Sequence, residues 1–365
     1  ERRDLPGGDL IRPYLERLGA DIAALARTAR DSRQPASIVY GRGRCSLAAN
    51  RDYYDQERRQ YVCGFNPGGM ADDTVLVARV TGRDSRPLAT VVNYACHATT
   101  LAWENTLISP DYVGAMREVV EGATGVPCLF VQGASGDVGP REGFVGDTAV
   151  ADRNGRQLGH AALAALEAVP PPDVCYEYAG PVVSGATLGT WKYVPLSGDR
   201  RRACETWQAH EFVVPLPYRH DLPRPEEVKR ERAKWEQEEA AAKAAGDALR
   251  ARDARAMTER MTRSLSRVGH LPPGDWYPYT VRLWRVGDAV WLALGGEHYN
   301  VLQRELRSRF SETPVLVGTI ANGSDVSYLL DKDSFGKGLY QEDVAVLARG
   351  SLETLIEAIA GKLRA

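Results

Sequence analysis

Long apolar segments are absent from this 365-residue chain. A membrane-spanning helix needs about eighteen or more consecutive apolar residues, and no run approaches that length. Residues 1–6 (ERRDLP) also lack the apolar stretch that a signal peptide requires, although a leader removed during maturation would leave the same start. The sequence therefore predicts no transmembrane segment.

A basic excess is also lacking. Lys and Arg number 46 against 48 Asp and Glu, which gives a formal net charge of −2. Proteins that bind nucleic acids in general neutralise phosphates with surplus positive charge, so this composition argues against such a partner. Hydrophobic residues make up 44% and charged residues 26%, which is typical of a soluble globular protein with a large core.

The six cysteines show no CxxC spacing and form no recognisable disulfide framework. Cys96 and Cys128 lie in apolar, strand-like runs, so we expect them to be reduced core residues. Cys45 and Cys63 flank a polar loop and could pair in a secreted protein. Both a cytoplasmic location and secretion after loss of a signal therefore stay open.

Helical and strand patterns alternate along the chain. Apolar spacing predicts helices over 9–30, 111–122, 149–168 and 342–362, and strands over 36–40, 75–80, 88–95, 127–131, 279–286, 289–294 and 314–319. This order predicts one α/β domain over residues 1–365, a mixed β-sheet sandwich flanked by helices. Residues 223–263 are rich in Glu, Lys, Arg and Ala, which predicts a long charged helical excursion. It is either a solvated hairpin or a partner-binding coiled coil.

Polar residues follow apolar strands at four places, where rigid scaffolds commonly display functional groups. These places carry His97, the glycine-rich loop with Asp137, the Gly295-Gly296-Glu297 run, and Asp325. Burying a carboxylate such as Glu297 is costly unless a cation meets it. A histidine at a strand end suits a metal ligand. Each signal alone is weak: a lone histidine at a strand end is more often a hydrogen-bonded structural residue, and a glycine-rich loop is as often an ordinary strand-to-loop corner.

Taken together and in order, these segments resemble the motifs of the neutral/alkaline ceramidase family and its bacterial relatives. The resemblance runs from about residue 10 to the C-terminus. It rests on Asn50-Arg51, Asn66-Pro67, Asn93–Thr99 (NYACHAT), Leu107–Gly114, Gln132–Val138 (QGASGDV), Gly295-Gly296-Glu297, and the block from Ser327-Tyr328 to Tyr340.

The resemblance implies a zinc site built from two histidines, a glutamate and a tyrosine. His97 matches one histidine and Glu297 matches the glutamate. Counting back from Tyr328 puts Asp325 at the position of the family's metal-binding tyrosine. The alignment needs one extra residue in the preceding loop. Aspartate suits zinc or a harder divalent ion, so the resemblance implies Zn²⁺ with another divalent metal as an alternative.

The resemblance also implies roles around the metal. Arg51 and Tyr340 would stabilise a developing oxyanion or hold a substrate carboxylate, and Asp137 would orient a ligand or the attacking water. The remaining matched residues would contact the substrate: Asn50, Gly136 and Tyr328.

Two departures narrow the expected function. The family's other histidine lies in a His-x-His-Ser-Gly-Pro motif that this sequence lacks, so we expect a separate N-terminal fragment or chain to complete the site. Gly139 also replaces the serine that is important to ceramidase catalysis. The resemblance therefore implies a metal-dependent hydrolase that cleaves a small-molecule amide or ester other than ceramide with metal-activated water. The alternatives are a true ceramidase or lipid amidase, and an inactive, ligand-binding relative.

Overall fold

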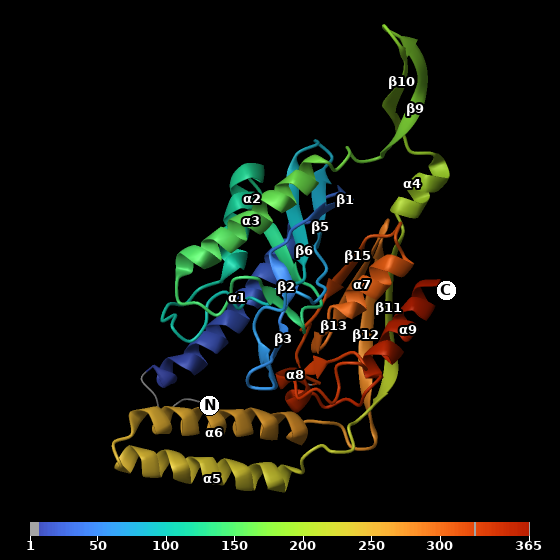
Figure 1. Cartoon of the computed structure of the whole chain (residues 1–365). Coiled ribbons are helices and arrows are strands. Elements are labelled where there is room, and N and C mark those ends of the chain that lie inside the picture. Colours follow the sequence, from blue (N-terminus) through green and yellow to red (C-terminus); the bar gives the residue numbers. More distant parts are fainter. Residues whose placement is uncertain (1–6, 325, 365) are drawn as a thin grey trace.

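Two four-stranded sheets form the centre of the molecule (Figure 1). In the computed structural model, which describes residues 7–324 and 326–364, the first sheet has the order β1-β5-β6-β7 and the second β11-β12-β13-β15. Pairing is antiparallel except between β6 and β7 and between β13 and β15. The strands are β1 Ala36–Arg44, β5 Thr74–Gly82, β6 Pro87–Tyr94, β7 Cys128–Gln132, β11 Trp207–Pro217, β12 Trp276–Val286, β13 Ala289–Leu294 and β15 Val315–Gly318.

The sheets are buried on both faces, which makes a sandwich of four layers. In β5, Val77 packs with α2 and α3 (Tyr112–Thr124 and Thr148–Glu167), whereas the next residue, Ala78, packs against the second sheet. The outer face of the second sheet is covered by α7 and α9 (Val301–Arg309 and Ser351–Arg364). Successive strand residues point to opposite faces, so burial on both faces explains the nearly continuous apolar run of β5.

A buried polar network joins the two sheets. The Asn93 amide, fully buried in β6, donates to the carbonyls of Val131 and Val317, both at 2.9 Å. Its oxygen accepts from Arg307 at 2.8 Å, and Arg307 forms an ion pair with Asp72 at 2.7 Å. Because these groups satisfy one another inside the core, the network fixes the relative position of the two sheets.

Two short strand pairs extend the sandwich at one end. β2 and β8 (Ala48–Asn50 and Val138–Pro140) pair antiparallel, and β14 and β16 (Glu297–His298 and Tyr328–Leu329) pair parallel. These pairs bring together segments that lie far apart in the sequence. The remaining short elements are η1 Gly8–Leu10, β3 Asp52–Asp55, β4 Gln60–Cys63, α4 Gly198–Cys204 and α8 Tyr340–Val344.

Three elements project from the sandwich (Figure 1). α5 and α6 (Pro225–Ala244 and Ala248–Gly269) form an antiparallel hairpin at one end, whereas β9 and β10 (Val174–Val183 and Thr187–Pro195) form an arm at the other. Along α1 (Ile11–Asp31) no side chain is buried, although its apolar residues recur at helical spacing.

The fold confirms the predicted mixed sandwich with flanking helices and the charged helical excursion, which runs on to Gly269. The predicted helix over 342–362 is confirmed only from Ser351, where α9 begins, because α8 ends at Val344 and Gly350 has a φ of 92°. All six cysteines are free, with Cys96 and Cys128 in the core as predicted. Within the described residues, no helix is both long and apolar enough to cross a bilayer.

Candidate active site

His97 follows β6 and is held in place by backbone carbonyls. Its Nδ1 lies 2.6 Å from the carbonyl oxygen of Ser135 and 3.2 Å from that of Val138. A carbonyl oxygen only accepts hydrogen bonds, so Nδ1 carries the proton. In the neutral ring, Nε2 then has a free lone pair, and it lies 2.9 Å from Oε2 of Glu297.

Glu297 reaches this position because two glycines precede it. Gly296 has a φ of 92°, and a Cβ there would lie 2.9 Å from the carbonyl of Ser327, so the turn requires glycine. The chain then enters β14, where Glu297 is opposite Tyr328 of β16. Burial alone would raise the pKa of Glu297, but hydrogen bonds with His97 and Tyr328 outweigh it and lower the pKa. The carboxylate is therefore held in its charged form.

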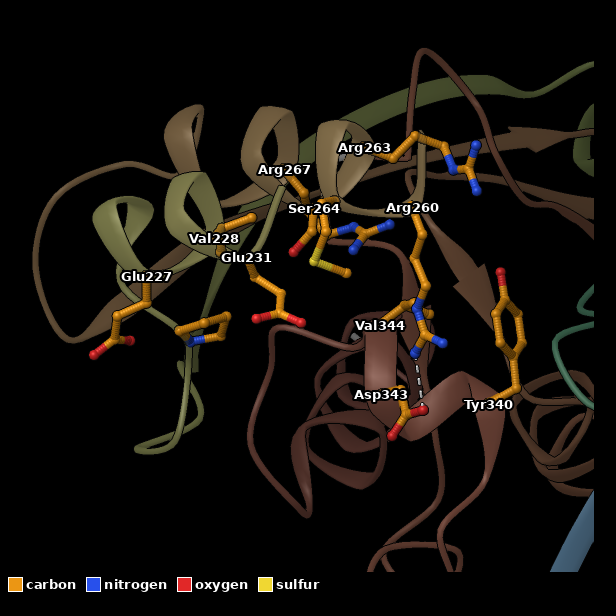
Figure 2. A pocket seen from close by; sticks show the side chains of 12 residues that line it. Glu227, Val228, Glu231, Arg260, Arg263, Ser264, Arg267, Tyr340, Asp343 and Val344 are labelled. Atoms are coloured by element: carbon orange, nitrogen blue, oxygen red, sulfur yellow. Dashed lines mark hydrogen bonds and ion pairs between the residues drawn. The ribbon is translucent and has the colours of Figure 1, made fainter. Parts of the chain in front are cut away.

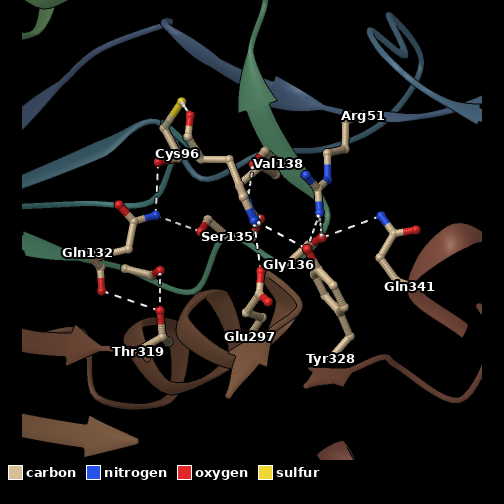
Figure 3. Close-up of polar contacts among 12 residues, drawn as sticks. Arg51, Cys96, Gln132, Ser135, Gly136, Val138, Glu297, Thr319, Tyr328 and Gln341 are labelled. Atoms are coloured by element: carbon tan, nitrogen blue, oxygen red, sulfur yellow. Dashed lines mark hydrogen bonds and ion pairs between the residues drawn. The ribbon is translucent and has the colours of Figure 1, made fainter. Parts of the chain in front are cut away.

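Tyr328 and Arg51 complete the group (Figure 3). The Tyr328 hydroxyl lies 3.5 Å from Nε2 of His97 and accepts a hydrogen bond from Nη2 of Arg51 at 3.1 Å. The same Nη2 donates to the carbonyl of Gly136 at 2.8 Å, and Arg51 is only 4% exposed. Burial raises the pKa of Tyr328, and Glu297 raises it further against the opposing effect of Arg51. The phenol is therefore protonated without an added cation.

The His97, Glu297 and Tyr328 atoms fit a divalent cation. Both Nε2 of His97 and the carboxylate oxygen of Glu297 can act as lone-pair donors, so their 2.9 Å contact requires a proton or a cation between them. Ligand atoms in a tetrahedral zinc site lie about 3.3 Å apart, similar to both contacts of Nε2. Among the described residues, no three His, Cys, Asp or Glu side chains form a metal-binding group, and the third polar atom beside Nε2 is the phenol oxygen of Tyr328.

Asp325 lies outside the described residues, so the structure does not place the residue that the sequence assigned to the tyrosine position. Tyr328, which the sequence assigned to substrate binding, instead lies beside His97 and Glu297. Tyr340, at the start of α8, is half-exposed, and its ring packs edge-on against that of Tyr328 at a centroid distance of 6.0 Å. It therefore lies at the rim of the group.

Gly136 lies against the backbone of β14. Its N–H donates to the carbonyl of His298 at 2.7 Å, and a Cβ would lie 2.8 Å from the carbonyl of Glu297. Any larger residue would push the two segments apart. The position therefore requires glycine, and its carbonyl is the acceptor that orients Arg51.

Asp137 and Asn50 support the loop behind this group. The Asp137 carboxylate accepts from the backbone N–H of Asn300 and from the Asn50 amide, the latter at 3.3 Å. Burial raises the pKa of Asp137 to about 7 despite the Asn300 hydrogen bond, and the charge of Asp52 adds to the rise. Among the described residues, neither the Asp137 nor the Asn50 side chain hydrogen-bonds His97, whose ring contacts Ser135, Val138, Glu297 and Tyr328.

Sequence reasoning missed a second polar layer. The Gln341 amide donates to Asp52 at 2.7 Å and to the Gly136 carbonyl at 3.4 Å, and the Tyr299 hydroxyl donates to Asp52 at 3.0 Å. Burial raises the pKa of the Asp52 carboxyl, although these hydrogen bonds oppose the rise. The sequence did hold one signal for these residues: Asp52 directly follows Arg51, and Gln341 directly follows Tyr340, both of which were predicted site residues.

Gly139 also lies at the site. A Cβ there would lie 3.4 Å from Oγ1 of Thr99, 3.9 Å from Cδ of Arg51 and 4.0 Å from Cβ of His97. The position that the resemblance assigns to a serine is therefore next to His97, and it has room for a small side chain.

Solved ceramidase structures share this fold. The neutral ceramidase from Pseudomonas aeruginosa superposes with a TM-score of 0.50 at 12% identity, over 89% of this chain and 51% of that chain. A ceramidase complexed with C2 gives a TM-score of 0.53 at 14% identity, over 91% and 54%. This chain thus spans about half the length of the ceramidases it matches. No protein-family model and no curated protein matches its sequence. The fold is therefore ceramidase-like, and at these identities the likeness concerns the fold alone.

Proposed function

We propose that this protein is a metal-dependent hydrolase that cleaves an amide C–N bond. The observation that carries the proposal is the 2.9 Å contact between Nε2 of His97 and the charged carboxylate of Glu297, with the Tyr328 hydroxyl beside both. A ceramidase-like fold around these residues supports the choice of reaction.

His97, Glu297 and Tyr328 would hold the cation, with Zn²⁺ as the first choice because imidazole and carboxylate suit it. When bound, such a cation supplies Lewis-acid activation of water and polarises an amide carbonyl. Asp325 is the alternative third ligand. The resemblance to ceramidases also implies a histidine from a His-x-His motif, and we include in the proposal that a separate fragment or chain supplies it.

Arg51 is placed to stabilise negative charge. Its guanidinium is buried and held by Tyr328 and the Gly136 carbonyl, while no acceptor among the described residues contacts its buried Nε. A fixed cation in a dry site stabilises an oxyanion more strongly than it would in water, because no reorganisation is needed. Arg51 therefore stabilises the oxyanion that forms from the reacting amide. Tyr340 contacts the substrate at the rim of the site.

The proposed substrate is a small amide other than ceramide, because Gly139 stands where the resemblance implies the ceramidase serine. The alternative, a true ceramidase, makes a different prediction for the same assay. Purified protein is incubated with short-chain N-acyl amides and with ceramide, and amine release is measured before and after chelation and Zn²⁺ add-back.

We expect amide cleavage that a chelator abolishes and zinc restores, and that His97→Ala lowers by at least about 100-fold. His160→Ala, at an exposed histidine of α3, is the matched control and is expected to keep full activity. Activity that survives both chelation and His97→Ala contradicts the metal proposal. Efficient release of fatty acid from ceramide overturns the substrate preference.

A further inference from the structure

A cavity of about 440 Å³ lies between the α5–α6 hairpin and α8. Its charged lining includes three arginines of α6, Arg260, Arg263 and Arg267, and three acidic residues, Glu227, Glu231 and Asp343. Tyr340 lines the same cavity (Figure 2). The positive and negative charges of the lining are equal in number. Whether the cavity attracts an anion therefore depends on which of these groups are already paired.

The three acidic groups are already engaged. Asp343 forms an ion pair with Arg260 at 3.0 Å, which Figure 2 shows bridging α6 and α8. Glu231 pairs with Lys234 along α5 at 3.3 Å. Glu227 accepts a hydrogen bond from the backbone N–H of Arg224 at 2.9 Å and so caps the start of α5.

Arg263 and Arg267 remain uncompensated. Neither guanidinium makes a hydrogen bond or ion pair with any residue that the structure describes. Their spacing of four residues puts both side chains on one face of α6. Burial lowers the pKa of Arg267, and the positive charges of Arg263 and Arg260 lower it further, against opposing effects of Tyr340 and Glu297. Mutual repulsion of this kind favours a bound anion.

The cavity adjoins the candidate active site through a single side chain. The ring of Tyr340 lines the cavity and packs against the ring of Tyr328, whose hydroxyl lies 3.5 Å from Nε2 of His97. A ligand that reached both places would therefore have one group beside His97 and another beside Arg267.

We propose that this cavity binds an anionic group, a carboxylate or a phosphate, on the substrate whose amide bond is cleaved beside His97. Two neighbouring guanidinium groups match such oxyanions because each presents paired N–H donors in a plane. This inference rests on the proposed hydrolase function for its biological meaning. On this proposal the α5–α6 hairpin helps to select the substrate and is more than a solvated excursion.

A kinetic experiment tests the inference on the full chain. Three amides with the same acyl group are compared: an N-acylglycine, an N-acyl-phosphoethanolamine and the neutral N-acylethanolamine. We expect Arg267→Gln and Arg263→Gln to raise KM for the anionic amides by about 10-fold or more, since a charge-assisted hydrogen bond contributes about 1.5–3 kcal/mol. KM for the neutral amide and kcat for all three should stay within about twofold of wild type.

Arg267→Lys, which keeps the charge, should restore part of the KM effect, and Arg230→Gln, an exposed arginine of α5 outside the cavity, should have none. The two anionic amides distinguish a carboxylate from a phosphate. Equal KM changes for neutral and anionic amides would overturn the inference while leaving the hydrolase proposal intact.

A binding measurement separates the two proposals if no amide is cleaved. Equilibrium dialysis of the full chain against inorganic phosphate, and separately against N-acetylglycine, measures anion binding without catalysis. We expect Arg267→Gln to weaken binding of at least one probe by about 10-fold or more relative to wild type and Arg230→Gln. Binding that is equal in all three proteins, or no binding of either probe, overturns the inference whatever the activity assay shows.

Discussion

The Nε2 atom of His97 lies 2.9 Å from Oε2 of Glu297, although 200 residues separate them in the sequence. Each side chain follows an apolar strand, His97 after β6 of the first sheet and Glu297 after β13 of the second. The sandwich therefore brings the ends of its two sheets together at a group of metal-ligand type, and the first predictions concern this group.

Tyr328→Phe and Asp325→Asn decide which side chain is the third metal ligand. The phenol lies beside both His97 and Glu297, so we expect Tyr328→Phe to weaken zinc binding by about 10–100-fold, as loss of a ligand or its close support does. Asp325→Asn should change it by less than about threefold. Competition with a chromophoric chelator measures both affinities, and the reverse ranking would assign the ligand to Asp325.

Arg51→Lys tests oxyanion stabilisation. Lysine keeps the charge but lacks the planar guanidinium, in which Nη2 holds the Gly136 carbonyl and the Tyr328 hydroxyl while Nε keeps a further N–H donor. We expect kcat for amide cleavage to fall about 100-fold with little change in metal content, since one lost oxyanion donor costs about 10²–10³ in rate. Metal content and near-UV circular dichroism are the controls for intact structure. An unchanged kcat would remove Arg51 from the mechanism.

Asp137→Asn tests the effect of burial on a carboxyl. The pKa of Asp137 rises from 3.8 to about 7 on folding, so between these values the folded state binds more protons than the unfolded state. Stability from this group is therefore present at low pH and lost as pH rises toward 7. Between pH 5 and 7 the loss is about 2 kcal/mol, at about 1.4 kcal/mol per pKa unit.

The amide of Asp137→Asn does not titrate, so the variant should lack this slope. Urea unfolding at pH 5 and pH 7 measures the difference in unfolding free energy between wild type and variant. We expect the wild type to have the larger relative advantage at pH 5. A difference that is the same at both pH values would show that Asp137 is charged throughout.

Asp72→Ala tests the buried network that joins the sheets. Asp72 and Arg307 pair at 2.7 Å with side chains only 8% and 10% exposed, so removing the carboxylate leaves an uncompensated buried cation. We expect a loss of about 3–5 kcal/mol in unfolding free energy. Asp253→Ala, which breaks an exposed pair on α6, should cost less than about 1 kcal/mol. Similar losses in the two variants would contradict the role given to the network.

Periodicity predicted the sandwich because most of its elements are long and buried on defined faces. The helix predicted over 342–362 starts too early, since Val346 and Leu347 keep the apolar pattern yet pack into the core from non-helical backbone. The arm formed by β9 and β10 was also missed. Most of its side chains are exposed, so little core packing was available to shape its sequence.

The sequence predicted those candidate-site residues that directly follow apolar strands, but not the position of a residue that depends on loop geometry. His97 and Glu297 follow apolar strands, which the sequence displays directly. The place of Tyr328 depends on Ser327, which has a φ of 55°, and on the two-residue pairing of β16 with β14. Counting residues cannot reproduce such a turn, so the position of Tyr328 beside His97 was not predicted.

Metal content tests the central claim most directly. The purified 365-residue chain is exposed to Zn²⁺, dialysed, and analysed by inductively coupled plasma mass spectrometry beside His97→Ala, Glu297→Gln and the control His160→Ala. We predict about one zinc per chain in wild type and the control, and a loss of about 10-fold or more in retained metal in the other two. Zinc retained equally by all four proteins, or by none, would contradict a metal site at His97 and Glu297.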